Sequence, residues 1–246
     1  MATHFARGTF NADHLISPRL SKECHNEARE LPEHRRHRFL ASRSLLAELM
    51  FMLYGLKTLP SLSRDEQGRP HFSDAGLADF SLSYAGNLVG VALTTEGRCG
   101  LGMELQRIAR NLSHPLASRC EPGLTSNETI WIANQNDPVE AKSQLMTLRR
   151  SVLKLTGQPK QELQLLPGAG RLRVADTPNV EAVCDAEDVL VWAIAVSPTT
   201  DKLKVWEFDM QQGWRGLPDT QKRTQGAEAR LMRFTSLPAE KALILN

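Results

Sequence analysis

The chain has 246 residues, and its 30 Lys and Arg against 28 Asp and Glu give a formal net charge of +2. A charge this small argues against a general nucleic-acid or membrane-surface binder, because such proteins carry a clear basic excess. With 41% hydrophobic and 24% charged residues, the chain has the composition of a globular protein and the length for one large domain or two small ones.

The spacing of the cysteines and the length of the apolar runs indicate the cellular location of the protein. The four cysteines lie far apart and form no C-x-x-C pair, which argues against a disulfide framework or a zinc site. The first twenty residues lack the apolar stretch of a signal peptide. The most apolar run, Leu45–Leu56, contains Glu48 and is shorter than the roughly 20 residues that span a bilayer. We therefore expect a reduced, cytoplasmic protein with no membrane partner.

The first half of the chain predicts one long helix followed by strands. Residues 1–30 are weakly patterned. Arg35–Leu53 has the periodicity of a helix, since Phe39, Leu46 and Met50 fall on one face, and Gly55 follows as a stop signal. After a stretch rich in turn formers, Gly and Asn mark the turns between three predicted strands, Asp79–Ser83, Val89–Thr95 and Gly100–Leu105.

The second half repeats this order of elements. A helix begins near Thr125, where Ser126 and the following residues can cap it. A longer helix is predicted over Val139–Thr156, with an apolar stripe of Leu145, Leu148, Val152 and Leu155 that ends at Gly157. The strands predicted after it are Gln161–Leu166, Arg171–Ala175, Val189–Val196 and Leu203–Phe208.

The repeated order predicts an α/β (α+β) protein of two similar halves, each a small, mostly antiparallel sheet packed by a long helix. We place the first half at residues 1–115 and the second at 116–210. Residues 211–246 are expected to form an extension docked on the second half, with an amphipathic piece near Ala229–Phe234.

Four pieces in this order resemble the 4′-phosphopantetheinyl transferase superfamily, in its larger, double-unit form. They are RHRFLASRSLL on the first helix, GRPHF in the loop after it, FSLSYAG running into GLGMELQR, and RRSVLKLTG at the end of the long helix. The resemblance covers roughly residues 35–206. It implies a pseudo-dimer of two α/β halves related by a pseudo-twofold axis.

The resemblance also implies a reaction and its partners. Members of the family move phosphopantetheine from coenzyme A (CoA) to a serine of an acyl or peptidyl carrier protein, with CoA and Mg²⁺ in the cleft between the halves. A hard divalent cation with carboxylate ligands offsets the charge that builds on the leaving phosphate. The implied partners are CoA, Mg²⁺ and a carrier protein. The small net charge argues against a nucleic-acid partner, and we expect a monomer.

The residues of the metal motifs depart from this pattern. The strand motif Gly-Val/Ile-Asp-x-Glu becomes Gly100-Leu101-Gly102-Met103-Glu104, so that the Glu is kept as Glu104 and the Asp is replaced by Gly102. In the helix motif Trp-x-x-Lys-Glu-Ala-x-x-Lys, Arg149 stands for the first Lys and Arg150 for the Glu. Two of the three carboxylate ligands are therefore missing, and Arg150 repels a metal ion.

The CoA contacts implied by the resemblance are carried by several arginines and their neighbours. In the upstream motif, Phe-Asn-x-Ser-His-Ser, the Ser is kept as Ser83, while Tyr84 replaces the His. The residues expected to bind CoA are Arg43, Arg69, Ser83, Tyr84, Arg149 and Lys154. For Arg43 and Arg69 the alternative is a solvated arginine, for Lys154 a lysine that stabilises the helix C-terminus, and for Tyr84 packing in the core or at the sheet edge.

Two hypotheses follow from these substitutions. Glu104 is a remaining metal ligand, a solvated carboxylate at the strand end, or a carboxylate paired with Arg149 or Arg150. Arg150 is either a surface residue or a cation in place of Mg²⁺. In the first hypothesis the protein is a degenerate family member that binds CoA or a carrier protein. In the second it is an active transferase with an altered magnesium site. The residue chemistry favours the first. A third reading is a fold reused for an unrelated protein–protein role.

Overall fold

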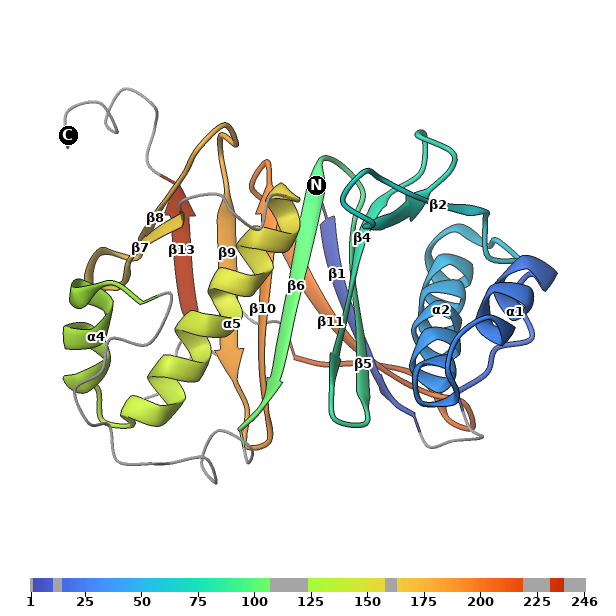
Figure 1. The fold of residues 1–246 in the computed structure, drawn as a ribbon, viewed down its shortest axis with the longest axis horizontal. Coiled ribbons are helices and arrows are strands. Elements are labelled where there is room, and N and C mark those ends of the chain that lie inside the picture. Colours follow the sequence, from blue (N-terminus) through green and yellow to red (C-terminus); the bar gives the residue numbers. More distant parts are fainter. Residues whose placement is uncertain (1, 11–14, 107–123, 158–162, 219–230, 237–246) are drawn as a thin grey trace. The chain divides into compact units, whose positions relative to one another are not determined.

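The computed structural model describes residues 2–10, 15–106, 124–157, 163–218 and 231–236. The chain forms two compact units, each containing residues from two separate stretches: Met1–Cys99 with Thr200–Arg223, and Gly100–Thr199 with Thr224–Asn246. Helices and sheets occur in both (Figure 1), so the protein is α+β. The predicted pseudo-twofold axis stays a prediction.

The first unit contains a five-stranded sheet in the order β12-β11-β1-β5-β4. Its strands are β1 (Ala2–Thr9), β4 (Asp79–Ala85), β5 (Leu88–Thr94), β11 (Lys202–Asp209) and β12 (Gly213–Gly216). The central strand, β1, pairs in parallel with β11 and antiparallel with β5; Phe5 lies opposite Val205 on one side and Ala92 on the other. The hairpin β4–β5 and the pair β11–β12 are antiparallel.

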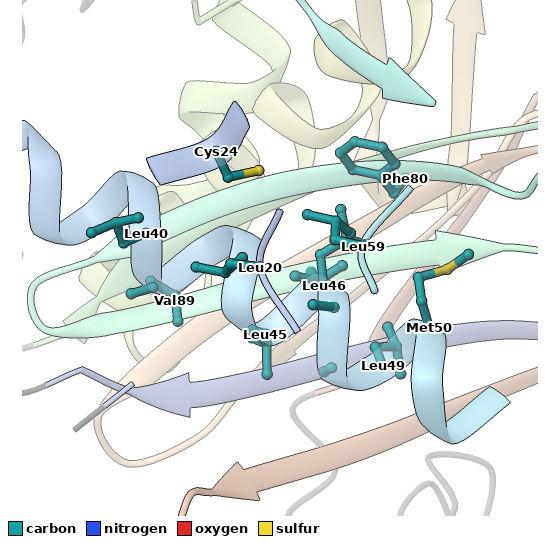
Figure 2. Packing of buried hydrophobic residues seen from close by; sticks show 14 of the residues in the cluster. Leu20, Cys24, Leu40, Leu45, Leu46, Leu49, Met50, Leu59, Phe80 and Val89 are labelled. Carbon is teal, nitrogen blue, oxygen red and sulfur yellow. The ribbon is translucent and has the colours of Figure 1, made fainter. Parts of the chain in front are cut away.

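Helix α2 (Glu33–Tyr54) packs one face of this sheet. Gly55 ends the helix in the left-handed conformation that glycine adopts readily, with φ of 70°. Helix α1 (Lys22–Arg29), capped by Ser21, also contributes to the core. Figure 2 shows this packing, with side chains from both helices and from β4 and β5, among them Cys24, Leu45, Leu46, Phe80 and Val89. A separate hairpin of β2 (Leu62–Arg64) and β3 (Pro70–Phe72) follows α2 in the chain.

The second unit contains a six-stranded sheet in the order β6-β10-β9-β13-β8-β7. Its strands are β6 (Arg98–Leu105), β7 (Leu163–Leu166), β8 (Arg171–Val174), β9 (Glu181–Ala186), β10 (Leu190–Ser197) and β13 (Met232–Ser236). A short 3₁₀ turn, η1 (Pro167–Ala169), joins β7 to β8. Most pairs are antiparallel, and β13 runs parallel to β8.

Helices α4 (Ser126–Ala133) and α5 (Pro138–Thr156) complete this unit. Thr125 and Glu128 form a reciprocal capping box at the start of α4. The predicted stripe of α5 is buried, since Leu145, Leu148, Val152 and Leu155 are each at most 1% exposed. Figure 1 shows α5 lying obliquely over the second sheet, and Gly157 ends it with φ of 70°.

Each unit has the same order of a strand, a long helix and a hairpin. In the first, β1 precedes α2 and pairs with β5, the last strand of the β4–β5 hairpin. In the second, β6 precedes α5 and lies next to β10, the last strand of the β9–β10 hairpin. This shared topology explains why the sequence shows the helix-then-strands order twice.

The predicted boundaries at residues 115 and 210 divide the chain into consecutive pieces, whereas each unit combines two stretches. β11, which the sequence assigned to the second half, pairs with β1. In the predicted extension, β12 joins the first sheet and β13 the second. Residue 115 itself lies outside the described residues, as do parts of the strand predicted at 161–166 and of the amphipathic piece at 229–234.

The described helices do not include one that combines the length and the apolar character that crossing a bilayer requires.

Candidate functional site

One face of β6 lies directly against helix α5. Because side chains alternate along a strand, Gly100, Gly102 and Glu104 share that face. A Cβ atom added to Gly102 would lie 2.4 Å from the carbonyl oxygen of Thr147, and one added to Gly100 would lie 2.0 Å from that of Ser151. The two glycines therefore let the strand and the helix backbone approach more closely than any other residue type would.

Glu104 follows these glycines and is paired with Arg150 of α5. The Nη2 atom of Arg150 lies 3.6 Å from Oε2 of Glu104, and Nη1 donates a hydrogen bond of 3.2 Å to the carbonyl oxygen of Met103. The Arg150 side chain is 46% exposed and that of Glu104 is 29% exposed. Of the sequence-based alternatives for Glu104, the structure therefore has the carboxylate paired with an arginine, Arg150.

These residues do not fit a Mg²⁺ site of the kind that the resemblance implies. Mg²⁺ requires oxygen ligands in near-octahedral geometry. Glu104 supplies one carboxylate, Gly102 has no side chain, and Arg150 places a positive charge on the same carboxylate. Within the described ranges, no three His, Cys, Asp or Glu side chains are grouped closely enough to hold a metal ion.

Arg149, the neighbour of Arg150, makes structural contacts inside the second unit. Its Nη2 donates to Oε1 of Glu128 at 2.5 Å, and its Nη1 donates to the carbonyl oxygen of Leu163 at 2.8 Å. The side chain of Glu128 is fully buried. Arg149 thereby ties α5 to α4 and β7, and its expected role as a CoA contact stays a prediction.

Arg43 of α2 is a buried arginine with no carboxylate paired to it among the described residues. The residue is 5% exposed, and its guanidinium carbon lies 3.9 Å from the centre of the Phe39 ring. Nη1 donates to Oγ of Ser42 at 3.0 Å, while the buried Nε has no hydrogen-bond partner. The same Ser42 hydroxyl accepts a hydrogen bond of 2.9 Å from the Tyr84 hydroxyl. Arg43, Ser42 and Tyr84 thus form one cluster in the first unit.

Burial lowers the pKa of Arg43 below its ordinary value, partly opposed by nearby Tyr84 and Glu27. The side chain still carries its charge at neutral pH, because the guanidinium group of arginine is not deprotonated in proteins. A guanidinium that is buried and not neutralised by a carboxylate is suited to an anionic ligand, which would supply both charge and acceptors.

Arg69 is engaged at the edge of the first sheet. Its Nη2 donates to Oδ2 of Asp79 at 2.6 Å and to the carbonyl oxygens of Phe80 and Cys99. Oδ2 of Asp79 also accepts from the backbone N–H of Cys99. These bonds fasten the loop before β3 to the start of β4 and to Cys99, all within the first unit. Whether Arg69 also contacts CoA stays a prediction.

For Ser83 and Lys154 the structure gives the position and burial of the side chain. Tyr84 packs with the cluster that contains α2, so its neighbour Ser83, which is 3% exposed, lies on the opposite face of β4. Lys154 is in the last turn of α5, half-buried. The expected CoA contacts thus divide between the first unit (Arg43, Arg69, Ser83 and Tyr84) and the second (Arg149 and Lys154).

Comparison with known proteins gives a family for the whole chain. No protein-family model matches it. Two Escherichia coli proteins named "Uncharacterized protein YieE", from strain K12 and from O6:H1 strain CFT073, are each 58% identical to it over 250 residues, which covers 100% of both chains. The chain belongs to the YieE family.

A further comparison bears on one part of the YieE-family chain. The 4′-phosphopantetheinyl transferase AcpT of Escherichia coli O157:H7 is 35% identical to it over 77 residues, or 31% of this chain and 36% of that protein. The similarity to a protein named as a phosphopantetheinyl transferase is therefore partial.

Two features of the candidate site were missed by the sequence analysis. Gly102 was interpreted only as a lost carboxylate, although two glycines at alternate positions of one strand are typical of close backbone approach. Ser42, which joins Arg43 to Tyr84, precedes Arg43 directly in the chain, but its contact with a side chain 42 residues away gives no local signal.

Proposed function

We propose that this YieE-family protein is a degenerate relative of the phosphopantetheinyl transferases, which binds CoA or a carrier protein carrying its phosphopantetheine without Mg²⁺. The transfer itself requires a cation on the diphosphate of CoA and a base for the attacking serine. Neither requirement is met by the residues that replace the metal motifs.

One observation carries this proposal: Glu104, the remaining carboxylate of the strand motif, is paired with Arg150, which stands where the motif has another carboxylate. An arginine there replaces a metal ligand by a cation. A guanidinium binds phosphate oxygens directly, through two parallel N–H donors. Arg150 can therefore leave Glu104 and bind the diphosphate of CoA without any metal ion.

The cluster of Arg43, Ser42 and Tyr84 supports the binding part of the proposal. A buried charge is destabilising unless a partner compensates it. No carboxylate among the described residues pairs with Arg43. Stacking on the Phe39 ring offsets only part of the cost of burying the charge. An anionic group such as a phosphate of CoA would complete the set of contacts.

The first experiment is a mass-shift assay. The purified protein is mixed with several apo carrier proteins, CoA, and Mg²⁺ or Mn²⁺, and each carrier is weighed for the phosphopantetheine adduct. An intact transferase serves as the positive control. We expect no adduct with any carrier, and an adduct would overturn the degenerate-site proposal.

The second experiment measures binding. Calorimetric titration of CoA is run with EDTA and again with Mg²⁺, and we expect the same affinity in both. Arg43→Met should weaken binding, whereas Arg38→Met, an exposed arginine on the same helix, should not. CoA binding that requires Mg²⁺ would contradict the proposal, and so would the absence of binding to both CoA and carrier proteins.

An active transferase with an altered magnesium site is the second candidate. It is supported by the partial similarity to AcpT, a protein named as a 4′-phosphopantetheinyl transferase. In that case Glu104 and oxygens of the substrate would have to hold the metal ion, and Arg150 would have to leave Glu104. The mass-shift assay separates the two candidates, since the second predicts an adduct that depends on the divalent cation.

A further inference from the structure

We propose that the close contact between Gly102 and helix α5 excludes a metal-binding side chain from position 102, so that the loss of the metal site is fixed by the backbone. This inference rests on the proposed function, because it concerns the same site. The inference goes beyond the proposed function, because it states that Asp at position 102 and Glu at position 150 would not together rebuild a three-carboxylate metal site.

The geometry at Gly102 is the first step. A Cβ atom there would lie 2.4 Å from the Thr147 carbonyl oxygen and 3.2 Å from Thr147 Cγ2. The first distance is far below a van der Waals contact, and it involves a backbone atom. Trimming the Thr147 side chain would relieve only the second contact, so room for an Asp at 102 requires movement of α5 itself.

Gly100 makes the same movement difficult. A Cβ atom there would lie 2.0 Å from the Ser151 carbonyl oxygen and 2.5 Å from the Leu155 nitrogen. Strand β6 therefore contacts the backbone of α5 at two points, Thr147 and Ser151, which lie one helical turn apart. The helix is also held by the fully buried Leu145, Leu148 and Val152, which pack in the core of the same unit. Close-packed interiors transmit a displacement rather than absorb it, so a shift of α5 would disturb this core as well.

Position 150 is different. The Arg150 side chain is 46% exposed, so a glutamate fits there without overpacking. Arg150→Glu would place a second carboxylate on the helix opposite Glu104. Any gain in divalent-cation binding at this site is therefore expected from position 150 alone, and Gly102→Asp should add nothing to it.

The test uses the full chain and two readouts that do not depend on activity: the melting temperature and the binding of Mn²⁺ by electron paramagnetic resonance. The variants are Gly102→Ala, Gly102→Asp, Arg150→Glu, and Gly102→Asp with Arg150→Glu. Gly102→Ala is also combined with Thr147→Ala. Gly168→Ala is the matched control, because a Cβ atom at Gly168 meets nothing within 4 Å.

We expect Gly102→Ala to lower the melting temperature by at least about 5 °C relative to Gly168→Ala, since overpacking a close contact destabilises the fold. Thr147→Ala should not rescue it. The double variant at 102 and 150 should bind Mn²⁺ no more tightly than Arg150→Glu.

A Gly102→Ala variant as stable as the Gly168→Ala control would overturn the inference. The same holds for a double variant that binds Mn²⁺ more tightly than Arg150→Glu. These outcomes are independent of the proposed function, which fails if the unmodified protein transfers phosphopantetheine or binds neither CoA nor a carrier protein.

Discussion

Nη2 of Arg149 lies 2.5 Å from Oε1 of Glu128, whose side chain is fully buried, so the two residues form an ion pair inside the second unit. Glu128 also accepts a hydrogen bond from the backbone N–H of Thr125 through its other oxygen. One carboxylate therefore both caps α4 and anchors α5 through Arg149.

Arg149→Met is expected to destabilise the protein strongly, because it leaves the Glu128 carboxylate buried without a cation. Breaking one partner of such a pair costs about 3–5 kcal/mol, which corresponds to a fall in melting temperature of about 10 °C. Adding Glu128→Gln should restore part of the loss, since the buried charge is then removed. Thermal unfolding followed by circular dichroism checks both variants.

The contrary outcome for Arg149 is equally clear. If Arg149→Met kept the melting temperature and lost affinity for CoA, the side chain would act mainly as a ligand contact, as the resemblance implies.

Arg43→Met is expected to change stability and binding in opposite directions. Removing a buried charge that no described carboxylate pairs should raise the melting temperature by about 2–4 °C, the equivalent of about 1 kcal/mol. Affinity for CoA should fall about tenfold or more, because a hydrogen bond to a charged group contributes about 1.5–3 kcal/mol. Differential scanning fluorimetry and calorimetric titration of the same preparation give both values. A lower melting temperature would mean that Arg43 is structural.

The long elements were predictable from the sequence because their periodicity is local. α2 and α5 show it over about five turns, and both end at the glycines predicted as stops, which adopt the left-handed conformation. Among the described strands, β1, β2, β3, β9, β12 and β13 were not predicted. The sequence of β1, ATHFARGT, lacks the alternation of a half-buried strand. The strand is central in its sheet, between β11 and β5, and its consecutive buried residues show that both of its faces are covered.

The candidate site was less predictable than the fold. The sequence indicated which residues replace the metal motifs, and Arg150 was one of the two expected partners of Glu104. The partner of Arg149, in contrast, is 21 residues away, and the contact of Gly102 is with a backbone atom of another element. Neither is encoded in local spacing, because both depend on how closely α5 packs on β6 and α4.

Two buried cysteines should be inert to thiol reagents in the folded protein. Burial is the main cause that raises the pKa of both Cys99 and Cys184 well above the ordinary value, and both are 0% exposed. The thiolate is the reactive form, so neither should be labelled by iodoacetamide at pH 8. Peptide mass spectrometry after labelling checks this, with protein unfolded in guanidinium as the control. Native labelling at the rate of the unfolded control would contradict the burial of these side chains.

We expect the folded protein to lose stability in mild acid because of His4. It is 6% exposed on β1, and its Nδ1 accepts a hydrogen bond of 3.1 Å from Trp206 Nε1, which requires a neutral ring. Burial, and then the charge of Lys204, lower the pKa of His4 from 6.5 to about 4. The unfolded chain therefore binds this proton more readily than the folded protein, and the stability contributed by the neutral ring is lost as the pH falls below 6.5.

Between pH 7.5 and pH 5 this linkage amounts to about 2 kcal/mol, or a fall in melting temperature of about 4–8 °C. His4→Gln should be less stable at pH 7.5 but should lack this part of the pH dependence, because glutamine does not titrate. Thermal unfolding at both pH values, for the unmodified protein and the variant, isolates the contribution of His4 from that of the other titrating groups. Equal pH dependence in the two proteins would mean that His4 takes up its proton in the folded state as easily as in the unfolded chain.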